Sequence, residues 1–112
     1  MCGIITLIGH KSKVTEKNTD EALEVMKHRG KDDRDKETIN DDSGRRAILG
    51  HNRLAINDLS SNGKQPFRRH GVTLICNGEI WNSPDLREKY NDKYGPYLST
   101  SDNEVIIYAY LE

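Results

Sequence analysis

The sequence has little cysteine, no long apolar run and almost no net charge. Cys2 and Cys76 are the two cysteines among 112 residues, too few for the disulfide framework of a small secreted domain. The apolar runs end after a few residues, far short of the roughly 20 that span a membrane. The first residues also lack the basic and apolar regions of a signal peptide. We therefore expect a cytoplasmic protein with no membrane partner.

The charge balance excludes a second group of functions. The chain has 17 basic and 18 acidic residues and a net charge of −1, so no bulk field favours nucleic acid or an anionic surface. Its four histidines and two cysteines are scattered singly. Because metal ligands usually come in closely spaced pairs, we expect no metal site. The remaining composition, 34% hydrophobic and 31% charged, is typical of one heavily charged globular domain.

Three short apolar stretches predict β-strands. The run at 4–8 is continuous and rich in β-branched residues, which is typical of a strand buried on both faces. Shorter runs predict strands at 45–50 and 72–76, and the last of these ends at an Asn-Gly turn signal. The segment 31–44 is charged and rich in turn formers, so we expect a solvated, mobile loop there. Residues 51–67 alternate poorly and are also expected to be largely loop.

Helical spacing and end signals predict helices on either side of these strands. The first helix starts at Thr19 or Asp20, which serves as N-cap, and stops at Gly30. A second helix covers residues 82–94, with Ser83 as its N-cap and a proline at the first helical position.

A third helix is predicted over residues 101–112. Its sequence, SDNEVIIYAYLE, opens with the capping-box pair Ser101 and Glu104. Its core face is predicted to hold Val105, Tyr108 and Ala109. Two or three strands with three helices predict a small α+β domain, in which one sheet edge stays open.

Cys2 directly follows the initiator methionine, although chain starts usually fray. If Met1 is removed, the Cys2 thiol lies next to a free α-amino group. Such an amine has an ordinary pKa of about 7.7–8.0 and can act as general base for the thiol, as with N-terminal threonine nucleophiles. Cys2 is therefore a candidate nucleophile. The alternative is a small apolar core residue, a common use of a lone cysteine.

The stretch CNGEIWN at 76–82 offers the partner that such a nucleophile needs. Asn77 supplies an amide side chain, and Gly78 supplies an unobstructed backbone N–H on the same turn. Two such donors can stabilise a tetrahedral oxyanion. The alternative is an ordinary tight turn, for which Asn-Gly is a common dipeptide.

Three charged residues are candidates for binding a charged substrate. Arg53 lies among apolar residues in GHNRLAIND, where a guanidinium can hold a carboxylate with two hydrogen bonds. The alternative for Arg53 is a surface ion pair of little energetic value. Asp102 lies at the start of the last predicted helix, where the helix dipole alone favours an acid. Glu79 could equally be an ordinary exposed carboxylate.

Taken in order, six motifs resemble those of class II glutamine amidotransferases. They are MCGI at the start, HRG at 28–30, GHNRLAIND at 50–58, QPF at 65–67, CNGEIWN at 76–82 and SDNEVII at 101–107. Their order and spacing are most similar to the N-terminal glutaminase domain of glutamine-dependent asparagine synthetase, whose motifs include HRGPD, NGEIYN and SDxEVI. The likeness covers essentially all 112 residues.

The resemblance implies a role for each matched residue in the chemistry. Cys2, freed of Met1, would attack the side-chain carboxamide of glutamine and release ammonia, leaving a γ-glutamyl thioester that water hydrolyses. The Asn77 side chain and the Gly78 N–H would stabilise the oxyanion. No cofactor is implied for this reaction, and no metal.

The resemblance also implies how glutamine would be held. Arg53 would bind the α-carboxylate, and Glu79 and Asp102 would face the α-ammonium group. Leu54 and Ile56, in the same motif as Arg53, are assigned to the glutamine site as well.

The implied fold is the N-terminal-nucleophile hydrolase type, an αββα four-layer sandwich. The family's domain is longer than this chain, so residues 1–112 are expected to be its N-terminal part, incomplete at the C-terminus. No SGGxDS-like nucleotide loop occurs, so the synthetase domain, which would need ATP and magnesium, is expected to be absent.

Three residues depart from the family's motifs. Lys31 replaces the proline of HRGPD, Trp81 replaces the tyrosine of NGEIYN, and Cys76 stands where an apolar or aromatic residue is usual. We expect no catalytic role for Cys76. The leading hypothesis is an ammonia-supplying glutaminase, partnered by a synthetase domain or subunit. The alternative is a truncated or split, catalytically silent domain that only binds or assembles with a second chain.

Overall fold

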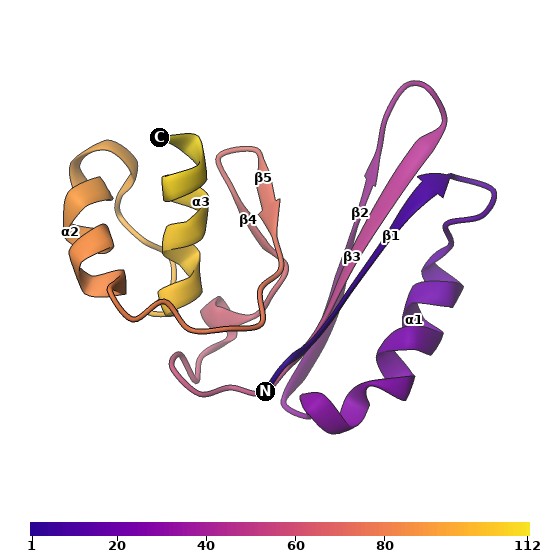
Figure 1. The fold of residues 1–112 in the computed structure, drawn as a ribbon, viewed down its shortest axis with the longest axis horizontal. Helices are drawn as coiled ribbons and strands as arrows, with labels where there is room; N and C mark the ends of the chain where they lie inside the picture. Colours follow the sequence, from indigo (N-terminus) through magenta and orange to yellow (C-terminus); the bar gives the residue numbers. More distant parts are fainter.

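The computed structural model describes residues 1–112 and has five strands, three α-helices and three short 3₁₀ helices, which confirms the α+β class (Figure 1). In chain order these are β1 (Gly3–His10), α1 (Glu16–Val25), η1 (Lys27–Arg29), β2 (Asp33–Asn40), β3 (Arg45–Arg53), η2 (Ser61–Gly63), β4 (Phe67–Arg69), β5 (Val72–Leu74), α2 (Ser83–Tyr94), η3 (Asp102–Glu104) and α3 (Val105–Leu111). None of the helices is long and apolar enough to cross a membrane.

The N-terminal half is an antiparallel sheet in the order β1–β3–β2, with α1 packed on one face (Figure 1). The helix inserts the buried Leu23 against Gly50 of the central strand. Because β1 and β3 run antiparallel, with Gly3 opposite Asn52, the start of β1 and the end of β3 meet at one end of the sheet. This pairing brings Cys2 and Arg53 to the same end, although 50 residues of sequence lie between them.

The C-terminal half combines the β4–β5 hairpin with α2 and α3 (Figure 1). Its core contains Phe67, Tyr90, Val105, Ile107 and Tyr108, all buried. Glu104 is fully buried among them and accepts hydrogen bonds from the Tyr108 hydroxyl and from the backbone N–H groups of Leu98 and Ser99. A buried carboxylate with this many donors is well compensated, and it ties the 98–99 loop to α3.

The prediction of a mobile loop over 31–44 is wrong, because β2 occupies most of that segment. Its side chains are largely polar, and two of them form ion pairs with α1, from Arg34 to Glu24 and from Lys36 to Asp20. The backbone pairs with β3 along its whole length. A charged edge strand of this kind carries no apolar alternation, so propensity alone does not reveal it.

The predicted strands have different limits and burial in the structure. β1 is a strand, but Ile4 and Ile8 are 42% and 67% exposed, because α1 covers only the other face of the sheet. β3 continues through Arg53 rather than stopping at residue 50, since β1 and β2 both pair with its last residues. β5 ends at Leu74, so the end of the predicted 72–76 strand lies outside the ladder.

The helix ends also differ from the predictions. α1 begins at Glu16, because the Thr15 hydroxyl accepts a hydrogen bond from the Asn18 N–H and caps the helix earlier. The N-cap of α2 is Asn82 rather than Ser83.

In the last segment, Ser101 caps η3 as predicted, by accepting from the Asn103 N–H. Glu104 does not complete a capping box, because its carboxylate is used in the core. The predicted core residues Val105 and Tyr108 are buried, whereas Ala109 is exposed.

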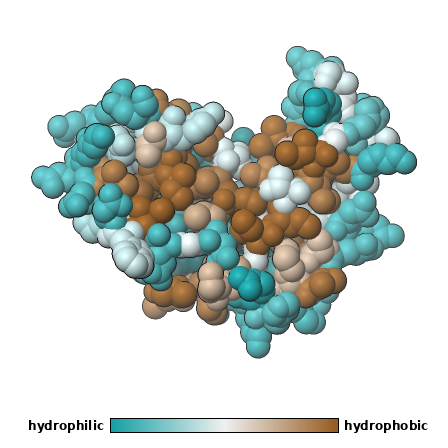
Figure 2. Space-filling model, in the orientation of Figure 1, coloured by the Kyte–Doolittle hydropathy of each residue, from teal (hydrophilic) through white to brown (hydrophobic).

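Apolar surface gathers across the middle of the molecule, between the two halves (Figure 2). The exposed face of the sheet contributes Ile4, Ile8 and Ile39. An ion pair from Arg68 of β4 to Glu37 of β2 joins the halves at 2.9 Å.

Candidate active site

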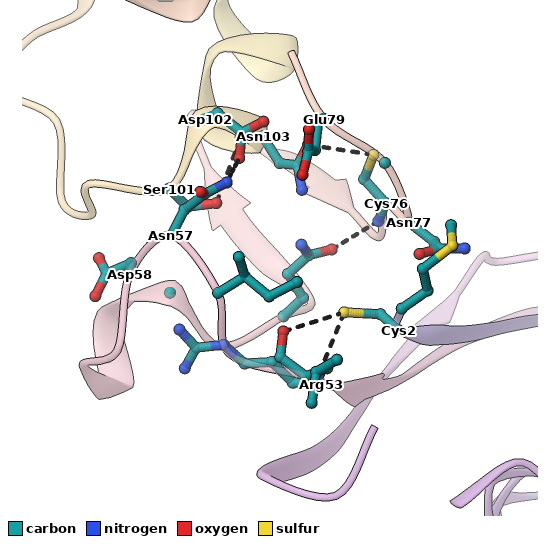
Figure 3. A pocket seen from close by; sticks show the side chains of 16 residues that line it. Cys2, Arg53, Asn57, Asp58, Cys76, Asn77, Glu79, Ser101, Asp102 and Asn103 are labelled. Atoms are coloured by element: carbon teal, nitrogen blue, oxygen red, sulfur yellow. Dashed lines mark hydrogen bonds between the residues drawn. The ribbon is translucent and has the colours of Figure 1, made fainter. Parts of the chain in front are cut away.

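A cavity of about 300 Å³ lies where the sheet meets the C-terminal half (Figure 3). This is at the small end of the range for ligand pockets. Its lining consists of Met1, Cys2, Arg53, Leu54, Ile56, Asn57, Asp58, Gly63, Gln65, Cys76, Asn77, Gly78, Glu79, Ser101, Asp102 and Asn103. All eight residues predicted for catalysis or glutamine binding are in this set, so segments from residue 2 to residue 102 converge on one cavity.

Cys2 is held at the start of β1 by contacts on both its side chain and its backbone. Its Sγ lies 3.3 Å from the backbone nitrogen of Leu54, which donates to it, and 3.7 Å from the Leu54 carbonyl oxygen. The Arg29 Nε donates to the Cys2 carbonyl at 3.0 Å. These contacts hold the thiol in a defined place at the end of the strand.

The HRG motif explains part of this geometry. Arg29 anchors Cys2, and the next residue, Gly30, lies against the end of β3. A Cβ at Gly30 would come within 2.5 Å of the Asn52 carbonyl oxygen. Only glycine allows this approach, which brings Arg29 within reach of the chain start.

Arg53 ends β3 and is 5% exposed. Its Nη1 donates to Asp33 Oδ2 at 2.9 Å and to the Ser60 carbonyl at 2.8 Å. Gly63 lies so close to the guanidinium that a Cβ there would clash with Nη2. Both hydrogen bonds come from Nη1. A guanidinium carries five N–H donors, so the other nitrogens still have donors for an anionic group in the cavity.

Residues 76–80, between β5 and α2, carry the predicted oxyanion donors on a segment outside any strand. The Cys76 N–H donates to Gln65 Oε1 at 2.6 Å, and the Ile80 N–H donates to Asp102 Oδ2 at 2.6 Å. Asn77 and Gly78 lie between these two fixed points and line the cavity. The side chains of Gln65 and Asp102 therefore hold this segment in place, because it has no strand pairing of its own.

Asp102 and Glu79 bring negative charge to the side of the cavity above Cys2 and Arg53 in Figure 3. Asp102 Oδ1 accepts from Asn57 Nδ2 at 2.8 Å, in addition to the contact with Ile80. Glu79 is exposed. Two carboxylates and a guanidinium on the lining of one small cavity suit a ligand that carries both a positive and a negative group.

The apolar part of the lining comes from the loop after β3. Leu54 and Ile56 are 38% and 60% exposed and line the cavity. The loop is held by Asp58, whose carboxylate accepts from the backbone N–H groups of Ser60 and Thr100, each at 2.8 Å. The Ser60 hydroxyl also donates to this carboxylate. The hydroxyl contributes most, and together these hydrogen bonds lower the pKa of Asp58 to about 2.

Burial also shifts the pKa values of two other side chains, those of Cys76 and His51. It raises the pKa of the Cys76 thiol, and the neighbouring Asp102 and Cys2 add to that rise. The thiol donates to Asn103 Oδ1 at 3.5 Å. A raised pKa keeps Cys76 protonated and weakly reactive. Burial lowers the pKa of His51, which keeps its imidazole neutral.

Residue type alone did not reveal several contributors to this site. Arg29, Gln65 and His51 lie inside the matched motifs HRG, QPF and GHNRLAIND, and this membership is the signal that could have singled them out. Their partners are Cys2 or Cys76, at least 11 residues away in sequence. No group of three or more histidine, cysteine or acidic side chains is placed to hold a metal ion.

Comparison with known proteins relates this chain to an enzyme family. Residues 1–112 match the family model described as a glutamine amidotransferase domain. The chain is 34% identical over 118 residues to asparagine synthetase (glutamine-hydrolyzing) 3 of Bacillus subtilis, covering all of this chain and 18% of that protein. It is 36% identical over 116 residues to asparagine synthetase B (glutamine-hydrolyzing) of Escherichia coli, covering all of this chain and 20% of that protein.

A third relative is named for a different activity. Amidase chry2 of Gibberella zeae is 30% identical over 123 residues, covering 98% of this chain and 18% of that protein. The chain thus spans about a fifth of the length of these curated relatives.

Proposed function

Because the chain belongs to the glutamine amidotransferase domain family, we propose that it hydrolyses glutamine to glutamate and ammonia through a thioester on Cys2. The observation that carries the proposal is the convergence of all eight predicted residues on one small cavity. The bond that breaks is the carbon–nitrogen bond of the side-chain carboxamide, and water supplies the oxygen of the new carboxylate.

The reaction starts when Met1, which lines the cavity, is removed and the Cys2 amine is free. The amine accepts the thiol proton while Sγ attacks the carboxamide carbon. The oxyanion accepts hydrogen bonds from the Asn77 side chain and the Gly78 N–H. The proton returns to the leaving nitrogen, which departs as ammonia. Water then attacks the thioester, releasing glutamate and restoring the thiol.

The charges around the cavity support glutamine as the substrate. The unused donors of Arg53 hold the α-carboxylate, and Glu79 and Asp102 attract the α-ammonium group. Asp33 and Ser60 fix the guanidinium from behind, so the fork is oriented before glutamine arrives. Leu54 and Ile56 pack against the apolar methylene groups. A dicarboxylate without the amine loses the second of these attractions.

We further propose that the ammonia is used by a synthetase domain or subunit, as the names of the relatives indicate for those proteins. ATP and magnesium belong to that partner, and glutamine hydrolysis itself needs no cofactor. The two sheets are proposed to be inner layers of an αββα sandwich. In support, α1 covers one face of the first sheet, α2 and α3 lie with the other sheet, and the second face of the first sheet carries the exposed Ile4, Ile8 and Ile39.

The alternative is a catalytically silent domain that binds glutamine or assembles with a second chain. The exposed isoleucines Ile4, Ile8 and Ile39 favour assembly, because apolar side chains grouped on one sheet face suit a covering partner. The two functions differ in whether the Cys2 thiol is activated.

Labelling and product measurement separate these alternatives. The chain is incubated with an electrophilic glutamine analogue, and intact mass and glutamate release from glutamine are measured. The glutaminase proposal expects loss of Met1, one adduct on Cys2 and glutamate release. Cys76→Ala is the matched control for the adduct site and should still be labelled once. Processed but unlabelled protein that releases no glutamate would reject the glutaminase function and support the silent domain.

A further inference from the structure

The backbone N–H and C=O of Cys76 are each held by a buried side chain, although Cys76 lies outside the sheet. β5 ends at Leu74, so neither the N–H nor the C=O of Cys76 takes part in a strand ladder. The N–H donates to Gln65 Oε1 at 2.6 Å, and the carbonyl oxygen lies 3.3 Å from His51 Nε2. Gln65 is 4% exposed and His51 1%. The next residue, Asn77, carries the proposed oxyanion donor.

The contacts of His51 determine its tautomer. A carbonyl oxygen only accepts, so Nε2 must carry the hydrogen and donate to Cys76. Nδ1 is then a bare acceptor, and it is the one buried side-chain nitrogen or oxygen without a hydrogen-bond partner. An unpaired buried acceptor is destabilising. An apolar side chain of similar size would fill this buried site without the unpaired nitrogen. The hydrogen bond to Cys76 is therefore what distinguishes histidine at this position.

We infer that His51 and Gln65 are positioning residues that fix the two peptide groups flanking the Cα of Cys76 and so aim the Asn77 side chain and the Gly78 N–H at the reacting carbonyl. This rests on the proposed glutaminase function. His51 does not line the cavity, so its effect on catalysis must pass through Cys76. At the other end of the segment, Asp102 holds Ile80, but Asp102 is itself assigned to the substrate.

The geometry explains why both contacts are needed. The N–H of Cys76 belongs to the peptide group before its Cα and the C=O to the peptide group after it. One hydrogen bond leaves the other peptide group free to turn about the φ and ψ angles of Cys76, whereas the two together fix both groups. Misplacement of a catalytic group by about 1 Å can cost on the order of 100-fold in rate. Oxyanion donors act mainly in the transition state, so the loss should appear in kcat rather than KM.

Matched pairs of variants test the inference on the full chain. His51→Gln keeps an N–H donor at similar reach, and His51→Leu removes it. Gln65→Glu keeps the acceptor, and Gln65→Met removes it. We expect His51→Leu and Gln65→Met to lower kcat about 10- to 100-fold with KM changed less than about threefold. The conservative member of each pair should recover most of the loss.

Alkylation of Cys2 by iodoacetamide, located by mass spectrometry, is the control for the nucleophile. Alkylation is a displacement that develops no oxyanion, so His51→Leu should leave its rate unchanged. If Cys2 alkylation falls together with kcat, or His51→Gln is as slow as His51→Leu, His51 is merely structural and the inference fails. If His51→Leu does not fold, the Gln65 pair decides by the same criteria.

A double-mutant cycle gives the sharpest readout. If His51 acts through Asn77, its replacement by leucine should cost several-fold less on an Asn77→Ala background than on the natural one. Full additivity would overturn the inference. Absence of glutaminase activity in the unmodified chain would instead overturn the proposed function, so the two failures are distinguishable.

Discussion

The two sides of the cavity are built in different ways. Cys2 directly precedes β1 and Arg53 ends β3, where the β1–β3 and β2–β3 ladders fix the adjoining backbone. Asn77, Glu79 and Asp102 lie on segments outside the strands, which single side chains hold in place. The sheet side distributes its stability over many backbone hydrogen bonds, while the loop side depends on a few contacts. Single substitutions of supporting residues should therefore disturb oxyanion stabilisation more readily than they disturb the nucleophile.

Replacement of Cys2 by alanine tests the sheet side with the largest expected effect. Without the thiol no thioester forms, so we expect glutaminase activity to fall by at least about 10³-fold, as for other lost nucleophiles. The fold should persist, because the strand pairing uses the backbone. Glutamate release and circular dichroism check both points. Glutamine hydrolysis that survives in Cys2→Ala would reject the assignment of the nucleophile.

The chain start should be as sensitive as the thiol itself. Retention of Met1, or an N-terminal tag, removes the free amine while leaving Cys2 in place. We expect activity close to that of Cys2→Ala, measured on protein whose N-terminus is verified by mass spectrometry. A tagged protein as active as the processed chain would show that the amine is not the base.

Replacement of Asn77 by alanine tests the loop side. Loss of one oxyanion donor should lower kcat by about 10²–10³-fold with little change in KM. Steady-state kinetics on glutamine measure the two constants separately. Asn62, an exposed asparagine that does not line the cavity, is the matched control, and its change to alanine should have no comparable effect. An equal loss in both variants would contradict the oxyanion assignment.

Replacement of Arg53 by lysine tests whether the sheet side also binds substrate. Lysine keeps the charge but loses the planar fork, and hydrogen bonds to charged groups contribute about 1.5–3 kcal/mol. We therefore expect KM to rise about 10- to 100-fold, with kcat less affected. Arg45, an exposed arginine at the far end of β3, provides the control Arg45→Lys. A changed kcat at unchanged KM would assign Arg53 to the chemistry instead.

Sequence patterns predicted the two sides of the cavity unequally. Apolar runs located β1, and the order of the motifs led to the prediction of Cys2, Arg53 and Asn77, which the fold brings to one cavity. The edge strand β2 was missed, because its side chains are mostly charged or polar, with Arg34 paired to α1 and Glu37 paired to β4, and its strand character comes from pairing with β3. Local patterns do not record such long-range pairing.

The supports of the loop side were missed for a related reason. The contact from Gln65 to the Cys76 N–H joins residues 11 apart, and that from His51 spans 25. Nothing in the residue type of Gln65 indicates which backbone group it will meet. Glu104 shows the same limit, since a helix-start glutamate fits a capping box in sequence and becomes a core acceptor in the fold.

The smallest predicted effect concerns the pH dependence of the loop after β3, which also lines the cavity. Asp58 holds the loop after β3 to residue Thr100, and hydrogen bonds from Ser60 and Thr100 lower its pKa from 3.8 to about 2. A carboxyl whose pKa is lower in the folded state stabilises the fold above its unfolded pKa. This contribution, at most about 2.5 kcal/mol, is present above about pH 5 and is lost as the pH falls from about 4 toward 2.

Thermal unfolding between pH 6 and pH 2.5 measures that contribution by comparison with Asp58→Asn. Other carboxyls with lowered pKa values, such as Glu104 and Asp41, titrate in both proteins, so the difference between the two curves isolates Asp58. The variant should be less stable at pH 6, and the gap should narrow as the natural chain is acidified. A gap that stays constant with pH would mean that the loop is held by the geometry of Asp58 and not by its charge. The anchoring of the loop after β3 would then be as insensitive to protonation as the backbone hydrogen bonds of the strand ladder.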